Sequence, residues 1–201
     1  MESTINIISL NLNGIQNKID TLIDLIDTSK PDLLLLQETK LSKETNLVFD
    51  HPDYKINEFR RDNQQNNNRS PGGGLMTLTK KTLQIIDEYE KTINNNEFLS
   101  TKIKTEKSNL EIINYYNPLT NLIDTNNILK LTKNKNSIFI GDLTANHQNW
   151  HNLQTNPGGT VLFKTISNNN LTHSKYTEYT YKHPGTGTES TNGMSRSRES
   201  W

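Results

Sequence analysis

Residues 31–39 read PDLLLLQET, and this stretch decides the fold. Its four consecutive leucines are bounded by a proline on one side and by polar residues on the other. A short, continuous apolar run of this kind is typical of a β-strand that is buried on both faces, as in a β-α-β unit. It is far too short to cross a bilayer, since a membrane-spanning helix needs about 20 apolar residues.

The residues before this strand supply the rest of such a unit. Residues 4–10 (TINIISL) are apolar and β-branched, which predicts a strand, and the turn residues of NLNG at 11–14 end it. Apolar residues then recur at helical spacing to about Thr28, which predicts an amphipathic helix that ends before Pro31. These apolar positions are Ile15, Ile19, Leu22, Ile23 and Ile26.

The residues after it follow a different pattern. Short alternating segments, separated by polar linkers of hairpin length, predict a run of antiparallel strands. The helical pattern returns at residues 120–131 and 161–166, and two more strands are predicted at 137–140 and 178–181. We therefore expect an α/β fold with helices on the outer faces of stacked sheets. The predicted antiparallel strands are residues 54–59, 74–79, 83–89, 98–104 and 110–115.

Composition excludes several classes of protein. The chain has 201 residues with 22 Lys and Arg against 22 Asp and Glu. This balance argues against a strongly basic DNA-coating protein, although local basic patches remain compatible with it. The absence of cysteine excludes disulfides, thiolate metal sites and cysteine nucleophiles. The first residues lack the features of a signal peptide, so we expect an intracellular protein with no membrane segment.

Only 31% of the residues are hydrophobic, against about 45% in ordinary domains. Asn-rich tracts at residues 66–68, 94–96 and 168–170 account for part of this deficit and are expected in loops. The rest lies in residues 182–201, which contain no Val, Ile, Leu or Phe. A segment that buries no apolar surface cannot offset its ordering entropy. We therefore expect one domain over residues 1–181 and a disordered tail over 182–201.

Three polar sites follow predicted strands directly. Asn11 follows the first strand, Glu38 follows the four leucines, and Asp142 follows the strand at 137–140. Loops after strand ends are where α/β proteins usually keep functional groups. Carboxylates and amide oxygens are hard ligands that suit Mg²⁺ or Mn²⁺ rather than zinc. The alternative interpretation is that Glu38 and Asp142 are ordinary turn residues at strand ends.

Five segments in this order resemble the endonuclease/exonuclease/phosphatase superfamily, and within it most resemble the endonuclease domains of non-LTR retrotransposons. The resemblance covers about residues 4–180 and implies a four-layer α/β sandwich, in which helices flank two packed mixed or antiparallel sheets. It also implies a Mg²⁺-dependent phosphodiesterase that nicks DNA, with Mn²⁺ as a substitute metal, and a nuclear location if the chain is part of a retroelement. The segments are INIISLNLNG (5–14), PDLLLLQETKL (31–41), GGGLMTLTKK (72–81), NYYNP (114–118) and IFIGDLTANHQNW (138–150).

The resemblance assigns roles to four residues. Asn11 matches an active-site Asn that helps to order the metal and the phosphate, and Glu38 matches the main Mg²⁺ ligand. Tyr116 matches a tyrosine that contacts the scissile phosphate. Asp142 matches an aspartate that orients or deprotonates the attacking water.

The chain departs from the family pattern in three places. Thr144 stands where the family has Asn, and losing one donor to the transition state costs about a hundredfold in rate. Asn146 lies two positions away and does not replace it. A strand that carries Asp and a following Ser-Asp-His are absent from residues 182–201, and the last strands of the second sheet are expected to be missing with them. The alternative function is therefore a catalytically dead, truncated remnant that binds metal or DNA weakly.

Other candidate residues carry weaker signals. A lone loop histidine such as His147 is expected to be a surface or hydrogen-bonded residue. Glycines 72–74 lack the Lys-Ser/Thr of a phosphate loop and are expected to form a turn before a strand. In a DNA nuclease, basic residues around the central strands would contact phosphates. These basic residues are Arg60, Arg61, Arg69, Lys80 and Lys81.

Overall fold

The four leucines form the centre of strand β2 (Leu33–Gln37), and every residue of this strand is buried. The computed structural model describes residues 4–61, 72–118, 123–132, 136–150, 152–169 and 171–172, together with the backbone of 181–182, 189–190 and 193–196. In the first sheet β2 pairs in parallel with β1 (Ile7–Asn11) and antiparallel with β4 (Leu75–Lys80). β3 (Tyr54–Phe59) pairs with β4, so that the strand order is β1-β2-β4-β3.

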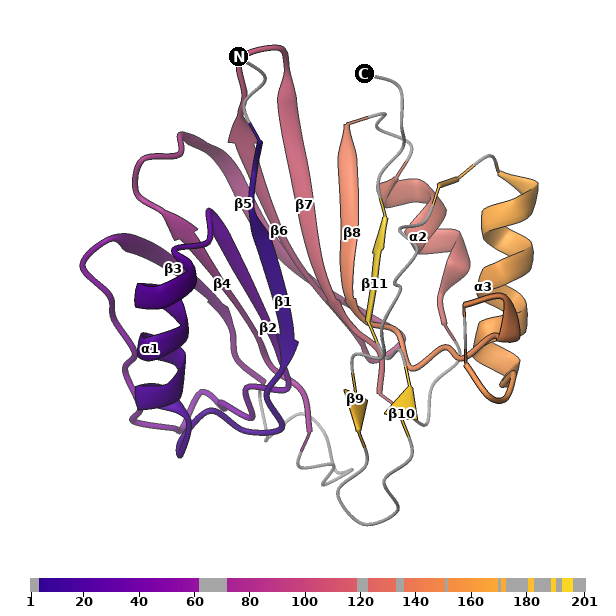
Figure 1. The fold of residues 1–201 in the computed structure, drawn as a ribbon, viewed down its shortest axis with the longest axis horizontal. Helices are drawn as coiled ribbons and strands as arrows, with labels where there is room; N and C mark the ends of the chain where they lie inside the picture. The colour runs from indigo at the N-terminus through magenta and orange to yellow at the C-terminus, as the bar shows by residue number, and fades with distance from the viewer. Residues whose placement is uncertain are drawn as a thin grey trace.

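Helix α1 (Ile19–Ser29) covers the outer face of this sheet (Figure 1). Its Leu22 and Ile26 are buried in a cluster with Leu34 and Leu36 of β2. The helix begins later than its apolar spacing predicts, because the preceding backbone is already bonded to the loop after β2. The N–H groups of residues 12, 14 and 15 donate to the carbonyls of residues 37, 38 and 39.

The second sheet contains three of the five predicted antiparallel strands, those at residues 83–89, 98–104 and 110–115, whereas those at 54–59 and 74–79 lie in the first sheet. The strand order of the second sheet is β11-β8-β7-β6-β5, and all neighbours are antiparallel except β7 and β8. This sheet packs against the first, so the described chain has two mixed sheets between helices, which confirms the predicted α/β sandwich (Figure 1). The strands are β5 (Ile85–Ile93), β6 (Asn96–Lys104), β7 (Asn109–Tyr116), β8 (Ser137–Asp142) and β11 (Gly193–Arg196).

Helices α2 (Thr125–Leu131) and α3 (Pro157–Asn168) lie on the outer side of the second sheet, with the short helix η1 (Gln148–Trp150) before α3 (Figure 1). α3 begins four residues earlier than its apolar pattern predicts. Asn156 caps it by accepting a hydrogen bond from Gly159 N (2.7 Å), and Pro157 suits the first turn. No helix in the described part of the chain is long and apolar enough to cross a membrane.

The leucines of β2 face two different layers. Leu34 and Leu36 pack towards α1, whereas Leu33 and Leu35 pack between the sheets against Ile112 of β7. This alternation follows from the period of two in a strand, and it explains why the run needs no polar positions. The predicted burial of this strand on both faces is therefore confirmed.

The sequence predicts no secondary structure in residues 182–201, whereas the structure has short strands there. β11 (Gly193–Arg196) joins the second sheet beside β8, and β9 (Tyr181–Lys182) pairs with β10 (Glu189–Ser190). Strand pairing uses backbone N–H and C=O groups, so a segment without Val, Ile, Leu or Phe can still add to a sheet edge. Most of the strand predicted at 178–181 lies outside the described residues, as do residues 119–122 of the second predicted helix.

Gly141 in β8 generates a first prediction. Its φ is +150°, and a Cβ there would lie 2.0 Å from the Tyr115 carbonyl oxygen of the paired strand. We expect Gly141→Ala to lower the free energy of unfolding by about 3 kcal/mol, measured by urea denaturation, because backbone atoms cannot move aside cheaply.

Gly158→Ala is the matched control. A Cβ at Gly158 would meet only side-chain atoms, Ile123 Cδ1 at 3.4 Å and Asn156 Oδ1 at 3.5 Å, and the residue lies in the first turn of α3. Since alanine favours a helix, this change should leave stability within about 1 kcal/mol of the parent. Equal losses in the two variants would refute the proposed close approach at Gly141.

Candidate active site

The predicted site residues meet where strands of both sheets end. Asn11 ends β1, Glu38 follows β2, and Asp142 ends β8. The Asn11 side-chain amide nitrogen donates to Glu38 Oε1 at 2.8 Å and to Asp142 Oδ2 at 2.7 Å. One amide therefore joins two carboxylates that belong to different sheets.

Asp142 is buried, with 8% of its surface exposed. Burial raises the pKa of its carboxyl group, and the charge of Glu38 raises this pKa further. The hydrogen bonds from Asn11 and from the Thr144 backbone N–H act in the opposite direction. The carboxyl group thus holds a proton more readily than an ordinary aspartate, which suits a group that accepts a proton from water.

Tyr116 lies beside these carboxylates. It pairs with Asp142 in the parallel register of β7 and β8, and its side chain is buried. Burial raises the pKa of its phenol, and the negative charges of Glu38 and Asp142 raise this pKa further. The hydroxyl group therefore stays protonated and can act as a hydrogen-bond donor. The structure thus brings all four residues of the predicted centre together.

Sequence reasoning missed Glu97, the second residue of β6, which follows the Asn-rich turn. Its buried carboxylate accepts a hydrogen bond from Gly74 N at 2.8 Å and forms an ion pair with Arg61 Nε. Burial raises the pKa of this carboxyl group, while the Arg61 charge lowers it. A lone Glu after three asparagines gives no sequence signal, because burial is decided by its partner strand β7.

A buried polar network supports the site from behind. Asn114 of β7 is fully buried, and its amide donates to the main-chain oxygens of Leu36 (3.2 Å) and Met76 (3.1 Å) in the first sheet. Its side-chain oxygen accepts a hydrogen bond from Gln37 Nε2 at 2.7 Å. These bonds fix the two sheets against each other one residue before Glu38. The sequence placed Asn114 in the NYYNP segment but gave it no role.

The donor set fits a divalent cation of the Mg²⁺ type. Glu38 and Asp142 each place an oxygen at the same amide nitrogen, and oxygen is the ligand that Mg²⁺ prefers. In the residues that the structure describes, no group of three or more His, Asp, Glu or Cys side chains is arranged to hold a metal.

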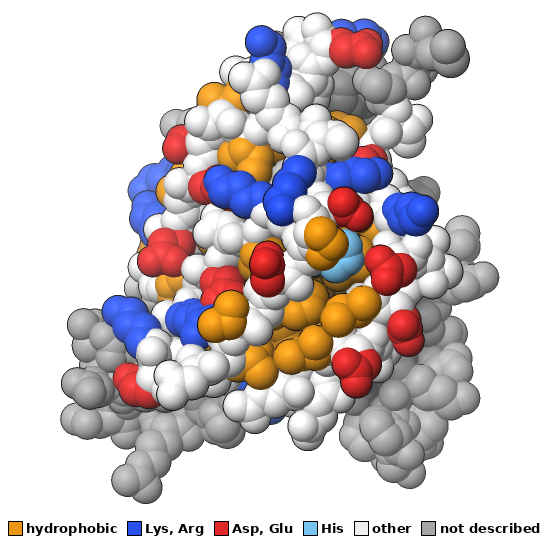
Figure 2. All heavy atoms as spheres, turned by 90° about the vertical axis from the view of Figure 1, so that its left-hand side faces the viewer, with side chains coloured by type: hydrophobic (Ala, Val, Ile, Leu, Met, Phe, Trp, Pro, Cys, Tyr) orange, Lys and Arg blue, Asp and Glu red, His pale blue; other side chains and the backbone are white. Residues whose placement is uncertain are grey.

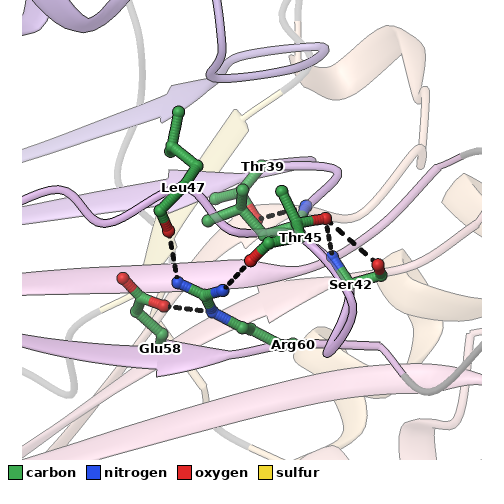
Figure 3. Close-up of polar contacts among 7 residues, drawn as sticks. Thr39, Ser42, Thr45, Leu47, Glu58 and Arg60 are labelled. Carbon is green, nitrogen blue, oxygen red and sulfur yellow. Dashed lines mark hydrogen bonds and ion pairs between the residues drawn. The ribbon is translucent and has the colours of Figure 1, made fainter.

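Arg60, expected to contact phosphate, instead anchors a loop (Figure 3). Its Nε donates to Glu58, and its two terminal nitrogens donate to the carbonyl oxygens of Thr45 and Leu47, both at 2.8 Å. These contacts hold residues 42–47 against β3. Arg60 therefore stabilises this loop, and we assign it a structural role rather than a DNA contact.

Lys80 and Lys81 lie at the wrong end of the sheet for a shared phosphate surface. β4 begins beside Gln37 with Leu75 and runs away from the site, which places Lys80 about 17 Å further along at 3.4 Å per residue. Lys80 faces Asp32 at 3.7 Å, and Lys81 donates to the Pro52 carbonyl. Arg69 lies outside the described residues.

The face of the molecule over α1 mixes charges of both signs. Lys and Arg side chains border an apolar patch there together with Asp and Glu side chains (Figure 2). A DNA backbone attracts a surface of uniform positive charge. The side chains of the described residues on this face do not form such a surface.

Thr144 adopts a backbone conformation that suits the Asn of the family pattern better. Its φ is +46°, in the left-handed region that β-branched residues rarely enter. Its hydroxyl donates to the Asn117 carbonyl (3.2 Å) and accepts from the Asn117 side chain (3.1 Å). The hydroxyl therefore links two loops. Asn146 is bonded to a different residue through its backbone. Its N–H donates to Asn156 Oδ1, and its carbonyl accepts from the Asn156 N–H.

His147 is part of an aromatic cluster rather than of the carboxylate centre. Its ring stacks on Phe163 of α3, with centroids 4.2 Å apart, and lies 5.4 Å from the Trp150 ring. Its Nδ1 accepts a hydrogen bond from Asn149 N at 3.2 Å. This agrees with the expectation that His147 is a hydrogen-bonded structural residue.

Two packed mixed sheets lie between helices, and the carboxylates of Glu38 and Asp142 meet at the strand ends. The sequence model of the Endonuclease/Exonuclease/phosphatase family matches residues 8–198, and the chain belongs to this family. No curated protein matches the sequence.

Solved structures of low sequence identity share the fold. The endonuclease domain of TRAS1, a telomere-specific non-LTR retrotransposon, is 16% identical with a TM-score of 0.75, and the match covers 98% of this chain and 86% of that one. The 3′ phosphatase NExo from Neisseria, bound to a product DNA hairpin, is 12% identical (TM-score 0.68, coverage 96% and 87%). TDP2 of D. rerio, complexed with a single-strand DNA product, is 14% identical (TM-score 0.61, coverage 98% and 85%).

The strain at Thr144 generates a second prediction. Asparagine tolerates positive φ, and Thr144→Asn and Thr144→Val both remove the hydroxyl bonds to Asn117, so we expect the free energy of unfolding of Thr144→Asn to exceed that of Thr144→Val by about 1 kcal/mol. Thermal or urea denaturation measures the change. Thr144→Val is the matched control, since it keeps the branched shape and removes the hydroxyl bonds to Asn117, and it should destabilise the fold. A loss of stability in Thr144→Asn as large as that in Thr144→Val would contradict the argument from strain.

Proposed function

We propose that this protein is a Mg²⁺-dependent phosphodiester hydrolase that nicks DNA. One observation carries the proposal: the Asn11 amide binds the carboxylates of Glu38 and Asp142 at once, from the ends of strands in two sheets, beside Tyr116. An ordinary pair of turn residues would gain nothing from placing two carboxylates at one nitrogen. Like charges held this close usually serve a cation or a proton transfer.

Each residue of the centre has a distinct role in this proposal. Glu38 holds the metal with help from Asp142, and a bound Mg²⁺ supplies charge stabilisation for the phosphate oxygens. Asp142 orients the attacking water and accepts its proton, which its raised pKa favours. Asn11 keeps the two carboxylates in place, and the protonated Tyr116 hydroxyl donates a hydrogen bond to the phosphate.

DNA is the substrate that the comparisons favour. The TRAS1 domain is an endonuclease, and the NExo and TDP2 structures contain DNA products. Lys40 follows Glu38 by two residues and bonds to the Asn13 side chain at the surface. In this proposal it is a basic group near the scissile phosphate.

Thr144 favours a second candidate function, that of an inactive domain with weak affinity for metal or DNA. Its hydroxyl is bonded to Asn117 and does not offer the amide donor that the family pattern has at this position. The loss of one such donor lowers a rate by about a hundredfold. We therefore propose an impaired nuclease, and activity measurements separate it from an inactive one.

The third prediction concerns cleavage. In a supercoiled-plasmid assay with Mg²⁺, we expect slow nicking that EDTA abolishes and that Glu38→Gln lowers by at least about a hundredfold. Glu38 is half-buried at the surface end of β2, so this isosteric change should leave the fold intact.

Lys55→Gln is the control variant, because Lys55 pairs with Glu88 at the surface, away from the centre. It should nick at the parent rate. Nicking that is equal in the parent and in Glu38→Gln would exclude this site. If no nicking occurs at any Mg²⁺ concentration, the inactive-domain alternative stands.

The fourth prediction separates impairment from inactivity. Thr144→Asn restores an amide donor in a backbone conformation that asparagine accepts, so we expect nicking to increase by about tenfold or more. Thr144→Ser keeps a hydroxyl group but supplies no amide donor, so it should not increase the rate. An unchanged rate in Thr144→Asn would show that this residue does not limit activity.

A further inference from the structure

Glu97 and Arg61 form a buried ion pair that the roles above leave without a purpose. The Glu97 side chain is 2% exposed and that of Arg61 is 20% exposed. Both Glu97 oxygens are engaged, one by Arg61 Nε and the other by the Gly74 backbone N–H. A pair of this kind contributes little net stability because of its desolvation cost, so it calls for another explanation.

The pair lies against Tyr116. Glu97 and Tyr116 are register partners in β6 and β7, so their side chains share one face of the sheet. The Arg61 guanidinium carbon lies 6.0 Å from the centroid of the Tyr116 ring. This distance is within the range of a cation–π contact. Arg61 therefore connects a buried carboxylate to the ring that carries the proposed donor hydroxyl.

The neighbouring backbone is shaped around Arg61. Gly73 has a φ of +96°, and a Cβ there would lie 2.1 Å from Arg61 Nε. The Arg61 backbone is fixed in turn, since its N–H donates to the Leu41 carbonyl and its own carbonyl accepts from Lys43 N. The glycines at 72–74, which are not a phosphate loop, thus leave room for this side chain.

The charges around Tyr116 point the same way. Glu38, Asp142 and Glu97 are negative groups near the phenol, and Arg61 is the positive group that opposes them. A tyrosine surrounded by carboxylates needs a fixed neighbour to keep its hydroxyl directed at an anionic phosphate. The Arg61 guanidinium is planar and is held at Nε by Glu97, so it can serve as that neighbour.

We propose that Arg61, held by Glu97, is a positioning residue that fixes the Tyr116 ring so that its hydroxyl meets the reacting phosphate. The proposal rests on the hydrolase function above and adds to it. Arg61 acts through Tyr116 rather than as a catalytic residue of its own. Arg61 and Tyr116 should therefore behave as one unit when both are changed.

A double-mutant cycle in the plasmid-nicking assay tests this behaviour. Arg61→Gln should lower kcat by about tenfold and change KM by less than about twofold, because misplacement of a positioned group affects the transition state. In a Tyr116→Phe background, which removes the hydroxyl, Arg61→Gln should lower kcat by less than about twofold more. Arg61→Lys should restore little, since a lysine cannot present the planar guanidinium.

Arg60→Gln is the matched control, because it also removes a guanidinium with three bonds but lies away from Tyr116. It should reduce thermal stability without lowering kcat. A purely structural role for Arg61 predicts additive losses in the cycle, and a direct phosphate contact predicts a rise in KM. Either result would overturn the proposal.

A measurement without turnover keeps this test separate from the proposed function. In ¹⁵N spectra of arginine side chains, the Arg61 Nε–H signal should shift in Tyr116→Leu, which removes the ring, and stay in place in Tyr116→Phe. If the parent shows no Glu38-dependent nicking, the hydrolase function has failed, and this spectrum alone decides whether Arg61 packs on Tyr116. An unchanged signal in Tyr116→Leu would overturn the contact.

Discussion

The buried amide of Asn114 is the interaction on which the rest of the structure depends. It spans the two sheets and bonds to main-chain oxygens of both β2 and β4, as well as to Gln37. A buried amide without partners is costly, so only one offset of the sheets satisfies all its bonds. That offset places Tyr116, two residues further along β7, opposite the loop that carries Glu38. Through the pairing of β7 with β8, it also brings Asp142 to Asn11.

The centre is assembled at the expense of local stability. The Asp142 carboxyl group is buried beside Glu38, which raises its pKa. Several residues near it have positive φ without being glycine, namely Asn13, Glu38, Lys40 and Thr144. Strained backbone and like charges at one place are typical of functional sites, where the rest of the fold compensates for them. The hydrophobic clusters around β2 supply that compensation here.

The sequence predicted the elements whose signal is local. The leucines of β2 and the alternating central strands follow from period and turn residues, and Asn11, Glu38 and Asp142 follow from strand ends. The basic residues did not follow, because their positions depend on pairing. Arg60 and Arg61 are adjacent after the end of β3, yet Arg60 bonds to Thr45 and Leu47 whereas Arg61 pairs with Glu97. The direction of β4 takes Lys80 away from the centre, and β11 pairs through its backbone, which leaves no apolar pattern to find.

The bond between Asn11 and Asp142 joins residues 131 positions apart in the chain. Closing a loop of that length costs entropy before any contact in the centre can form. The centre is therefore expected to appear late in folding, after each sheet has formed and the sheets have docked. A partly folded chain would hold its carboxylates apart and bind a divalent cation poorly. Affinity for the proposed cation would thus report on whether the two sheets have come together, as well as on the chemistry of the site.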